Sequence, residues 1–296
     1  MSMGKDTLTG LKVKNAMRRQ LVVLQPDDTI DCCIQYLTKY KVNALLIGFD
    51  GEKPLGVVSK TDIMGAWYAG LSLSTPIEMI MNSPPLFCSL EDTLDSALNT
   101  MKTNNIYRLY ALEDELKSAV GAIAYPDIVG ILYLYCSQCS LGIFNKNSET
   151  AQERVKRYKV LEIMTKGIEA CKEEDALESV IEILSASRLG AILVADDQNY
   201  PKGVISKTDI ILCYRHGLDL NIPARQIMSA PVALCRQDAP VESAIKTMIL
   251  KDLHRLFVVP KKNQPVSGII SLADAARFRS GSCHACVSSR IRIDEY

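Results

Sequence analysis

Serine and aspartate side chains lie three residues apart at matching points of this sequence: Ser59 and Asp62, Ser206 and Asp209, and Ser271 and Asp274. A fourth copy keeps Asp127 but has Ala124 in place of the serine. Each pair stands between an apolar run and a helix-like pattern, where the free N–H groups of a first helical turn favour an anion. The hydroxyl can donate to such an anion, and the carboxylate can accept from hydroxyl groups. The alternative is structural, because Ser and Asp also favour helix N-caps.

Cationic side chains accompany these pairs. Lys60 and Lys207 directly follow two of the serines, where an ammonium group can reach a bound phosphate or stay solvated at the surface. Arg108 and Arg255 begin apolar runs, where a lone arginine is costly without an anionic partner. That partner can be a ligand phosphate or an internal carboxylate. His254 can add charge or serve as a hydrogen-bonded core residue.

The elements that position these residues come from a repeated sequence, which is the first thing to establish about a fold. The segment GVVSKTDI at 56–63 returns as GVISKTDI at 203–210, an offset of 147 residues. Each half is itself doubled, since Met17 and Met81 are 64 residues apart, as are Met164 and Met228. The chain therefore holds four repeats, arranged as two pairs.

One helical pattern recurs in every repeat. Its apolar residues keep relative spacings of 0, 3, 4 and 7, which place them on one face of a helix: Ile30, Cys33, Ile34, Leu37; Leu94, Ala97, Leu98, Met101; Leu177, Val180, Ile181, Leu184; and Val241, Ala244, Ile245, Met248. Two strand-like runs and a second helix follow. The predicted fold class is α/β (α+β), with four β-α-β-β-α repeats in two pseudo-two-fold pairs.

The predicted domain boundaries follow the repeats. The first pair covers 10–142, with repeats at 13–68 and 76–135, and the second covers 158–282, with repeats at 159–215 and 223–279. The polar stretch 143–157 is the predicted linker, and 283–296 is a cysteine-containing tail. A single repeat cannot bury both of its apolar faces, so we expect the two repeats of each half to pack together.

The Ile/Ala-Met start, the β-α-β-β-α core and the ending Gly-h-x-Ser-x-x-Asp, where h is apolar, resemble the CBS domain, named after cystathionine β-synthase. The resemblance implies that repeats pair through their sheets and that the clefts bind adenosyl compounds such as AMP, ADP, ATP or S-adenosylmethionine. It also implies that two pairs stack as a disc. The segment 253–259 further resembles the γ subunit of AMP-activated protein kinase, whose basic side chains contact nucleotide phosphates. The segment 106–109 holds the same place in the second repeat, with Tyr107 replacing histidine.

The resemblance also places the adenine base at the start of the second strand of a repeat. Small residues there leave room for a flat ring in the first and third repeats, whereas the second and fourth carry bulk and charge. We therefore expect two base pockets, with phosphate ligands from the other two repeats. The predicted nucleotide-binding set is Val42, Asn43, Ala44, Ser59, Lys60, Asp62, Arg108, Asp127, Leu189, Gly190, Ala191, Ser206, Lys207, Asp209, His254, Arg255, Ser271 and Asp274.

Two C-x-x-C pairs are separated by the same offset of 147 residues: Cys136 and Cys139, and Cys283 and Cys286. This spacing lets both thiolates of a pair reach one metal, and two pairs supply the four ligands of a zinc or iron–sulfur site. Two alternatives remain open: the duplication copied a pair of inert cysteines, or the cysteines form a thiol switch.

Composition and missing motifs argue against several classes of function. Lysine and arginine (34) balance aspartate and glutamate (34), so we expect neither nucleic acid nor an anionic membrane as partner. The N-terminal residues lack the apolar region of a signal peptide, and we expect a cytoplasmic protein. The sequence has no P-loop, no H-E-x-x-H and no G-x-S-x-G, so we predict that it is not an enzyme.

The predicted function is a regulatory sensor of adenine nucleotide or S-adenosylmethionine. It would act through an unidentified protein partner or through a homodimer. A metal- or redox-responsive scaffold built on the C-x-x-C pairs is the alternative.

Overall fold

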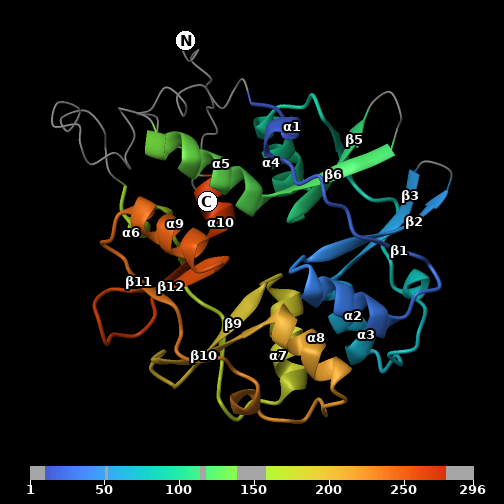
Figure 1. Cartoon of the computed structure of the whole chain (residues 1–296). Coiled ribbons are helices and arrows are strands. Elements are labelled where there is room, and N and C mark those ends of the chain that lie inside the picture. Colours follow the sequence, from blue (N-terminus) through green and yellow to red (C-terminus); the bar gives the residue numbers. More distant parts are fainter. Residues whose placement is uncertain (1–10, 51–52, 114–117, 139–157, 278–296) are drawn as a thin grey trace.

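The computed structural model describes residues 11–50, 53–113, 118–138 and 158–277. The first half contains two copies of one small unit (Figure 1). Repeat 1 consists of α1 (Val13–Ala16), β1 (Val23–Leu24), α2 (Ile30–Lys39), β2 (Ala44–Asp50), β3 (Lys53–Ser59) and α3 (Lys60–Tyr68). Repeat 2 consists of η2 (Ile77–Met79), β4 (Phe87–Ser89), α4 (Leu94–Thr103), β5 (Arg108–Glu113), β6 (Ser118–Ala124) and α5 (Tyr125–Gln138).

The second half has the same order of elements, with one added short strand, β7. Repeat 3 consists of α6 (Val160–Ile163), β7 (Thr165–Lys166), β8 (Ala170–Cys171), α7 (Leu177–Ala186), β9 (Ala191–Ala195), β10 (Pro201–Ser206) and α8 (Lys207–Arg215). Repeat 4 consists of η3 (Ala224–Gln226), β11 (Leu234–Arg236), α9 (Val241–Leu250), β12 (Arg255–Val259), β13 (Gly268–Ser271) and α10 (Leu272–Arg277). The predicted β-α-β-β-α order and fold class are confirmed.

Each repeat has its own small sheet, with the second strand in the middle. The orders are β1-β2-β3, β4-β5-β6, β10-β9-β8 and β11-β12-β13-β7. The first two strands of a repeat pair in parallel, and the last two pair antiparallel. In the fourth sheet β7, which begins repeat 3, pairs with β13 of repeat 4. The start of one repeat therefore crosses onto the sheet of its partner.

The predicted apolar helix faces are buried. All four predicted residues are buried in α2, α4 and α7, and three of the four are buried in α9, where Ile245 is partly exposed. The side-chain oxygens of Thr29 and Thr93 accept hydrogen bonds from Cys32 N and Ser96 N, which caps the first turns of α2 and α4. None of the described helices is long and apolar enough to cross a membrane.

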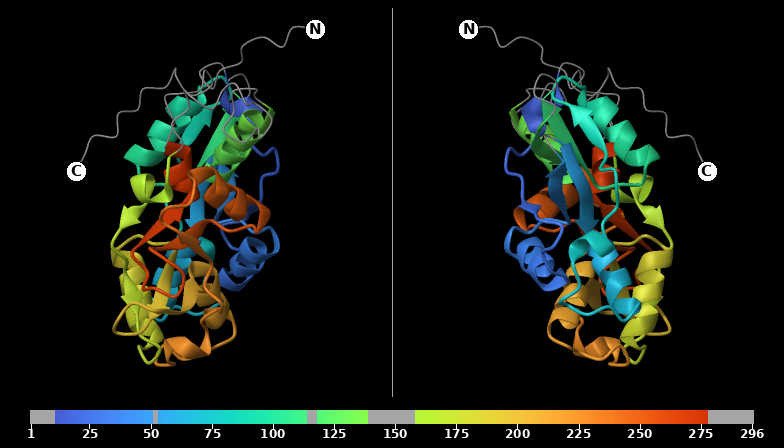
Figure 2. Two further views of the ribbon diagram at one scale, coloured as in Figure 1. Left: turned by 90° about the vertical axis from the view of Figure 1, so that its left-hand side faces the viewer. Right: turned by 90° about the vertical axis from the view of Figure 1, so that its right-hand side faces the viewer.

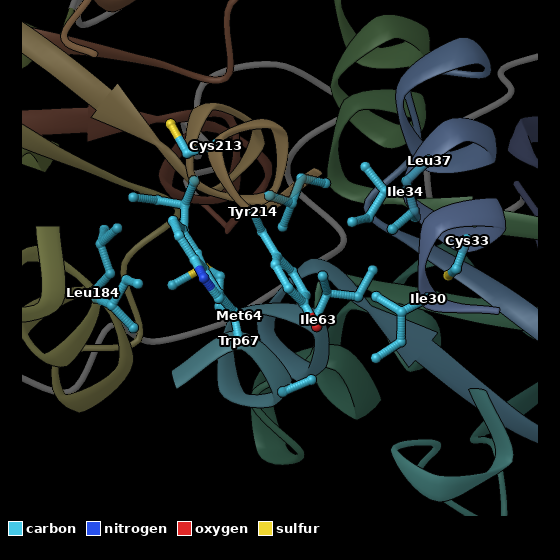
Figure 3. Close-up of a cluster of buried hydrophobic side chains, with 14 of the residues drawn as sticks. Ile30, Cys33, Ile34, Leu37, Ile63, Met64, Trp67, Leu184, Cys213 and Tyr214 are labelled. Carbon is cyan, nitrogen blue, oxygen red and sulfur yellow. The ribbon is translucent and has the colours of Figure 1, made fainter. Parts of the chain in front are cut away.

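Two large cores join the halves of the chain through their helices. One core consists mostly of residues of repeats 1 and 3, and the other mostly of residues of repeats 2 and 4, while the first helix of each repeat packs into the core of the other pair. In the first core, Trp67 of α3 stacks on Tyr214 of α8 with ring centroids 5.4 Å apart (Figure 3). Both side views in Figure 2 likewise show the first half of the chain, in blue to green, lying beside the second half, in yellow to red.

Smaller apolar clusters join the repeats within each half. Leu46 of β2 clusters with Tyr110 of β5 between repeats 1 and 2, and Leu193 of β9 clusters with Phe257 of β12 between repeats 3 and 4. Every repeat thus contacts its own partner through strands and the other half through helices. The stacked disc stays a prediction.

Candidate functional site

One oxygen of each of the four repeated aspartates is used to cap a helix. Oδ2 of Asp62 accepts from the backbone N–H of Ser59 at 2.7 Å and from its hydroxyl at 2.6 Å. The same two bonds recur at Asp209 (2.7 and 2.7 Å) and at Asp274 (2.8 and 2.7 Å), and Asp127 accepts from Ala124 N at 2.9 Å. The serine stands at the N-cap of α3 and α8, with the aspartate at the third helical position. The helix-capping alternative therefore holds for Oδ2.

The second oxygen, Oδ1, has a side-chain partner in repeats 1 and 2 but not, among the described residues, in repeats 3 and 4. Asp62 Oδ1 accepts from Asn82 Nδ2 at 2.8 Å, and Asp127 Oδ1 is paired with Arg18 Nε at 2.5 Å. Among the described residues, Oδ1 of Asp209 and Oδ1 of Asp274 accept no hydrogen bond. Two of the four carboxylates are therefore free to accept from a ligand hydroxyl.

Arg18 and Asn82 were not among the predicted site residues. Each comes from the partner repeat and directly follows one of the repeated methionines, Met17 and Met81. The offset of 64 residues between those methionines was a usable signal. Sequence reasoning missed it because the repeat start was not expected to reach the other repeat's carboxylate.

The two lysines cross between the halves of the molecule. Lys60 Nζ donates to Thr208 Oγ1 at 2.8 Å, and Lys207 Nζ donates to Thr61 Oγ1 at 2.7 Å. Burial lowers the pKa of both lysines, Arg108 contributes to the lowering at Lys60 and Arg255 to that at Lys207, and both pKa values fall to about 8. Lys60 is 8% exposed, so its interpretation as a solvated surface lysine is wrong.

The two arginines reach from the even repeats onto the predicted base positions of the odd ones. Arg108 Nη1 lies 3.4 Å from the carbonyl oxygen of Ala44, within hydrogen-bonding reach. A Cβ added to Gly190 would lie 2.2 Å from Arg255 Nη2, so the guanidinium rests against this glycine. Neither arginine has a carboxylate ion pair within the described ranges, and the buried Nε of Arg108 lacks a hydrogen bond. Within the described residues, neither Arg108 nor Arg255 is therefore held in place by an internal salt bridge.

Strand register explains why these groups meet. Ala44 pairs with Ser59, and Ala191 pairs with Ser206. The backbone carbonyl of Asn43 accepts from Lys60 N at 3.1 Å, and that of Gly190 accepts from Lys207 N at 3.2 Å. The start of the second strand is thereby held beside the Ser-x-x-Asp turn of the same repeat. The remaining predicted base residues, Val42 and Leu189, are partly buried against the core of repeats 1 and 3.

The family model for the CBS domain matches four segments of the chain: residues 13–68, 77–133, 160–216 and 224–281. Together these segments make up most of the sequence. The chain belongs to the CBS domain family.

Two solved structures share the fold of this chain, and one curated protein is similar to it in sequence. A solved structure of protein MJ1225 from Methanocaldococcus jannaschii, described as a proposed archaeal homologue of g-AMPK, superposes with a TM-score of 0.75 at 17% identity, covering 90% of this chain and 99% of that one. An uncharacterized conserved protein from Pyrococcus horikoshii superposes with a TM-score of 0.60, also at 17% identity, with the same coverage. The uncharacterized protein MJ1404 of M. jannaschii is 21% identical over 285 residues. That alignment covers 90% of this chain and 61% of MJ1404, so the chain spans about three fifths of that relative's length.

His254 and Tyr107 face one another across the CBS pairs. Their rings stack with centroids 5.7 Å apart. Burial lowers the pKa of His254, and the nearby cations Arg255 and Lys60 lower it further. These effects disfavour the charged imidazole, and the stacking with Tyr107 favours its role as a packed ring over a role as a phosphate-binding charge.

The cysteines of these CBS repeats divide into two groups. Cys139, Cys283 and Cys286 lie outside the described residues, as does the side chain of Cys136, so the metal prediction stays a prediction. Within the described segments, no group of three or more His, Cys, Asp and Glu could hold a metal. Cys33 and Cys88 are buried, and burial raises the pKa of both thiols to about 12. These two cysteines act as small apolar core residues.

Proposed function

We propose that this chain is a regulatory module that binds AMP, ADP, ATP or S-adenosylmethionine between its CBS repeats and signals to a protein partner through a conformational change, without catalysing a reaction. The observation that carries the proposal is that hydrogen-bond acceptors and cations lie close together. Carboxylate oxygens that can accept from ribose hydroxyls lie near cationic side chains that lack a carboxylate partner. An adenosine phosphate supplies hydroxyls to the first and negative charge to the second.

The two lysines and two arginines of the candidate site are the strongest argument for a bound anion. Lys60 and Lys207 are buried or partly buried, yet within the described segments each ammonium donates to a threonine hydroxyl and to no carboxylate. Arg108 and Arg255 add like charge close by, which lowers the pKa of the two lysines. Holding several cations together in a partly desolvated place is unfavourable without an anion. A phosphate bound among them would offset that cost.

The position of these contacts gives a route for signalling. The Lys60–Thr208 and Lys207–Thr61 bonds join repeat 1 to repeat 3, so they cross between the two halves. A phosphate that drew either ammonium away would change how α3 and α8 meet. A ligand that binds one arrangement better than the other shifts the population toward it, and a partner can read that shift.

Thermal unfolding of the full chain with AMP, ADP, ATP and S-adenosylmethionine, each at increasing concentration, tests the proposal. We expect at least one of them to raise Tm, because a ligand that binds only the folded state stabilises it by about 2.7 kcal/mol at 100 times its Kd. Asp209→Asn should lessen this rise, and the double variant Asp209→Asn with Asp274→Asn should abolish most of it. Asparagine keeps an oxygen that can cap α8 but loses the charge that favours ribose hydroxyls.

Two controls make the outcome specific. Asp238→Asn changes an exposed carboxylate that pairs with Arg236 on the surface, and its ligand-induced rise should equal that of the wild type. Inorganic phosphate alone should raise Tm less than the nucleotide, since it offers nothing to the carboxylate. An unchanged Tm with all four adenosyl compounds would refute the proposed function.

A further inference from the structure

The residue that follows each repeated methionine occupies one structural position in all four repeats. Arg18 N donates to Ala122 O, Asn82 N to Val57 O, and Ser229 N to Val204 O, each at 2.9 Å. Thr165 is paired with Ile269 in the same way. Ala122, Val57, Val204 and Ile269 each stand five residues before the aspartate of their own repeat. Every carboxylate is therefore faced by one residue from the partner repeat.

The four facing residues differ in what they do to that carboxylate. Arg18 places a guanidinium 2.5 Å from Asp127 Oδ1, and Asn82 places a neutral amide 2.8 Å from Asp62 Oδ1. Ser229 and Thr165 are short hydroxyl residues, and within the described part of the chain neither donates to Asp209 or Asp274. The four carboxylates thus range from charge-neutralised to lacking a side-chain partner at Oδ1 among the described residues, although the backbone pairing around them is equivalent.

The cleft of repeat 2 differs from the others in a second way. Ala124 stands where the other repeats have serine, so a ligand finds no hydroxyl there. The Asp127 side chain is only 7% exposed, whereas the Arg18 side chain is 63% exposed and reaches the carboxylate from the surface. A charge-assisted hydrogen bond is roughly twice as strong as a neutral one, so a ribose hydroxyl competes poorly with the guanidinium.

We propose that the residue after the repeated methionine decides which clefts accept a ribose, and that Arg18 closes the cleft of repeat 2 by holding Asp127. This inference rests on the proposed function. It assigns Arg18, Asn82, Thr165 and Ser229 as specificity-determining residues. The clefts of Asp209 and Asp274 are open, the cleft of Asp62 requires displacement of a neutral amide, and the cleft of Asp127 takes no ligand.

Exchange of the facing residues tests the inference by calorimetric titration with AMP. Ser229→Arg copies the closing residue into the cleft of Asp209 and should remove one binding site or weaken it at least tenfold. Ser229→Gln is the matched control for bulk without charge, and its cleft should bind AMP more tightly than that of Ser229→Arg. The pair Arg18→Ser with Ala124→Ser should add one site, and this gain decides the matter if Ser229→Arg does not fold.

The outcomes of these titrations distinguish the inference about the facing residues from the proposed function. If the wild type binds AMP but neither exchange alters the number or affinity of sites, the inference is wrong and the proposed function stands. If Arg18→Ser alone weakens AMP binding, Arg18 contacts the ligand and the inference is likewise wrong. If neither the wild type nor any variant gives heat with AMP, ADP, ATP or S-adenosylmethionine, the proposed function fails and the inference falls with it.

Discussion

The second helix of each repeat packs against the second helix of a repeat in the other half, in one contact between repeats 1 and 3 and another between repeats 2 and 4. The two contacts differ in the residues that begin these helices. Lys60 and Lys207 begin the second helices of the odd repeats and cross to threonines of the opposite half. Tyr125 and Leu272 hold the equivalent positions in the even repeats and are buried. The first contact therefore has ammonium groups at the two helix starts, whereas the second has a buried tyrosine and a buried leucine there.

The second strands show the opposite division. Ala44 and Ala191 begin these strands in the odd repeats, while Arg108 and Arg255 hold the same register in the even ones. The odd repeats thus supply small residues at the strand start and the ammonium groups. The even repeats supply guanidinium groups that lie against those small residues. Duplication of one fold has therefore produced two kinds of repeat, whose combination forms the candidate site.

The largest effect should come from breaking the core of repeats 1 and 3. Trp67 is 8% exposed and stacks on Tyr214 of the opposite half. Trp67→Ala should lower the free energy of unfolding by about 3–5 kcal/mol, as for large aromatic truncations elsewhere. Urea denaturation measures the change. The neighbouring Tyr68 is 44% exposed, and Tyr68→Phe should change stability far less; equal losses in both variants would contradict this role of the core.

A smaller effect should follow from adding a methyl group at Gly190 of repeat 3, where Arg255 lies. Gly190→Ala would set a methyl group 2.2 Å from Arg255 Nη2, so the guanidinium must move. Because Nη2 ends a flexible side chain, we expect stability to change by less than about 1 kcal/mol while AMP binding weakens about tenfold. Titration calorimetry measures the affinity. Gly65→Ala meets no atom within 4 Å and should leave AMP binding unchanged.

The smallest effect concerns pH. The folded-state pKa of Lys60 and of Lys207 is about 8, below the usual 10.5, so between these values the unfolded chain binds more protons. Stability should therefore rise with pH from about 8 to 10.5, by on the order of 1 kcal/mol per lysine. Burial raises the pKa of several cysteine and tyrosine groups, which opposes the rise.

A comparison of variants isolates the lysine contribution. The stability of the Lys60→Met and Lys207→Met double variant should lack the rise, so its difference from wild type is the quantity to measure. Chemical denaturation at pH 7, 9 and 10.5 provides it. A difference that stays constant across this range would show that the two ammonium groups are not desolvated.

Much of this architecture could be predicted from the sequence because it repeats. The spacing of Ile30, Cys33, Ile34 and Leu37 is dictated by helix geometry and recurs at Leu177, so the buried faces were predictable. The pairing of Arg18 with Asp127 was not, since it depends on a repeat start that crosses onto the partner's sheet. Local patterns show which face of an element is apolar, but they do not show which distant side chain completes a polar site.

A structure of the full chain with saturating AMP tests the central claim most directly. The account predicts ribose hydroxyls donating to Asp209 Oδ1, with the phosphate among Lys60, Lys207 and the two arginines and with Arg255 displaced from Gly190. A structure with Arg255 still against Gly190 and no nucleotide in any cleft would contradict it.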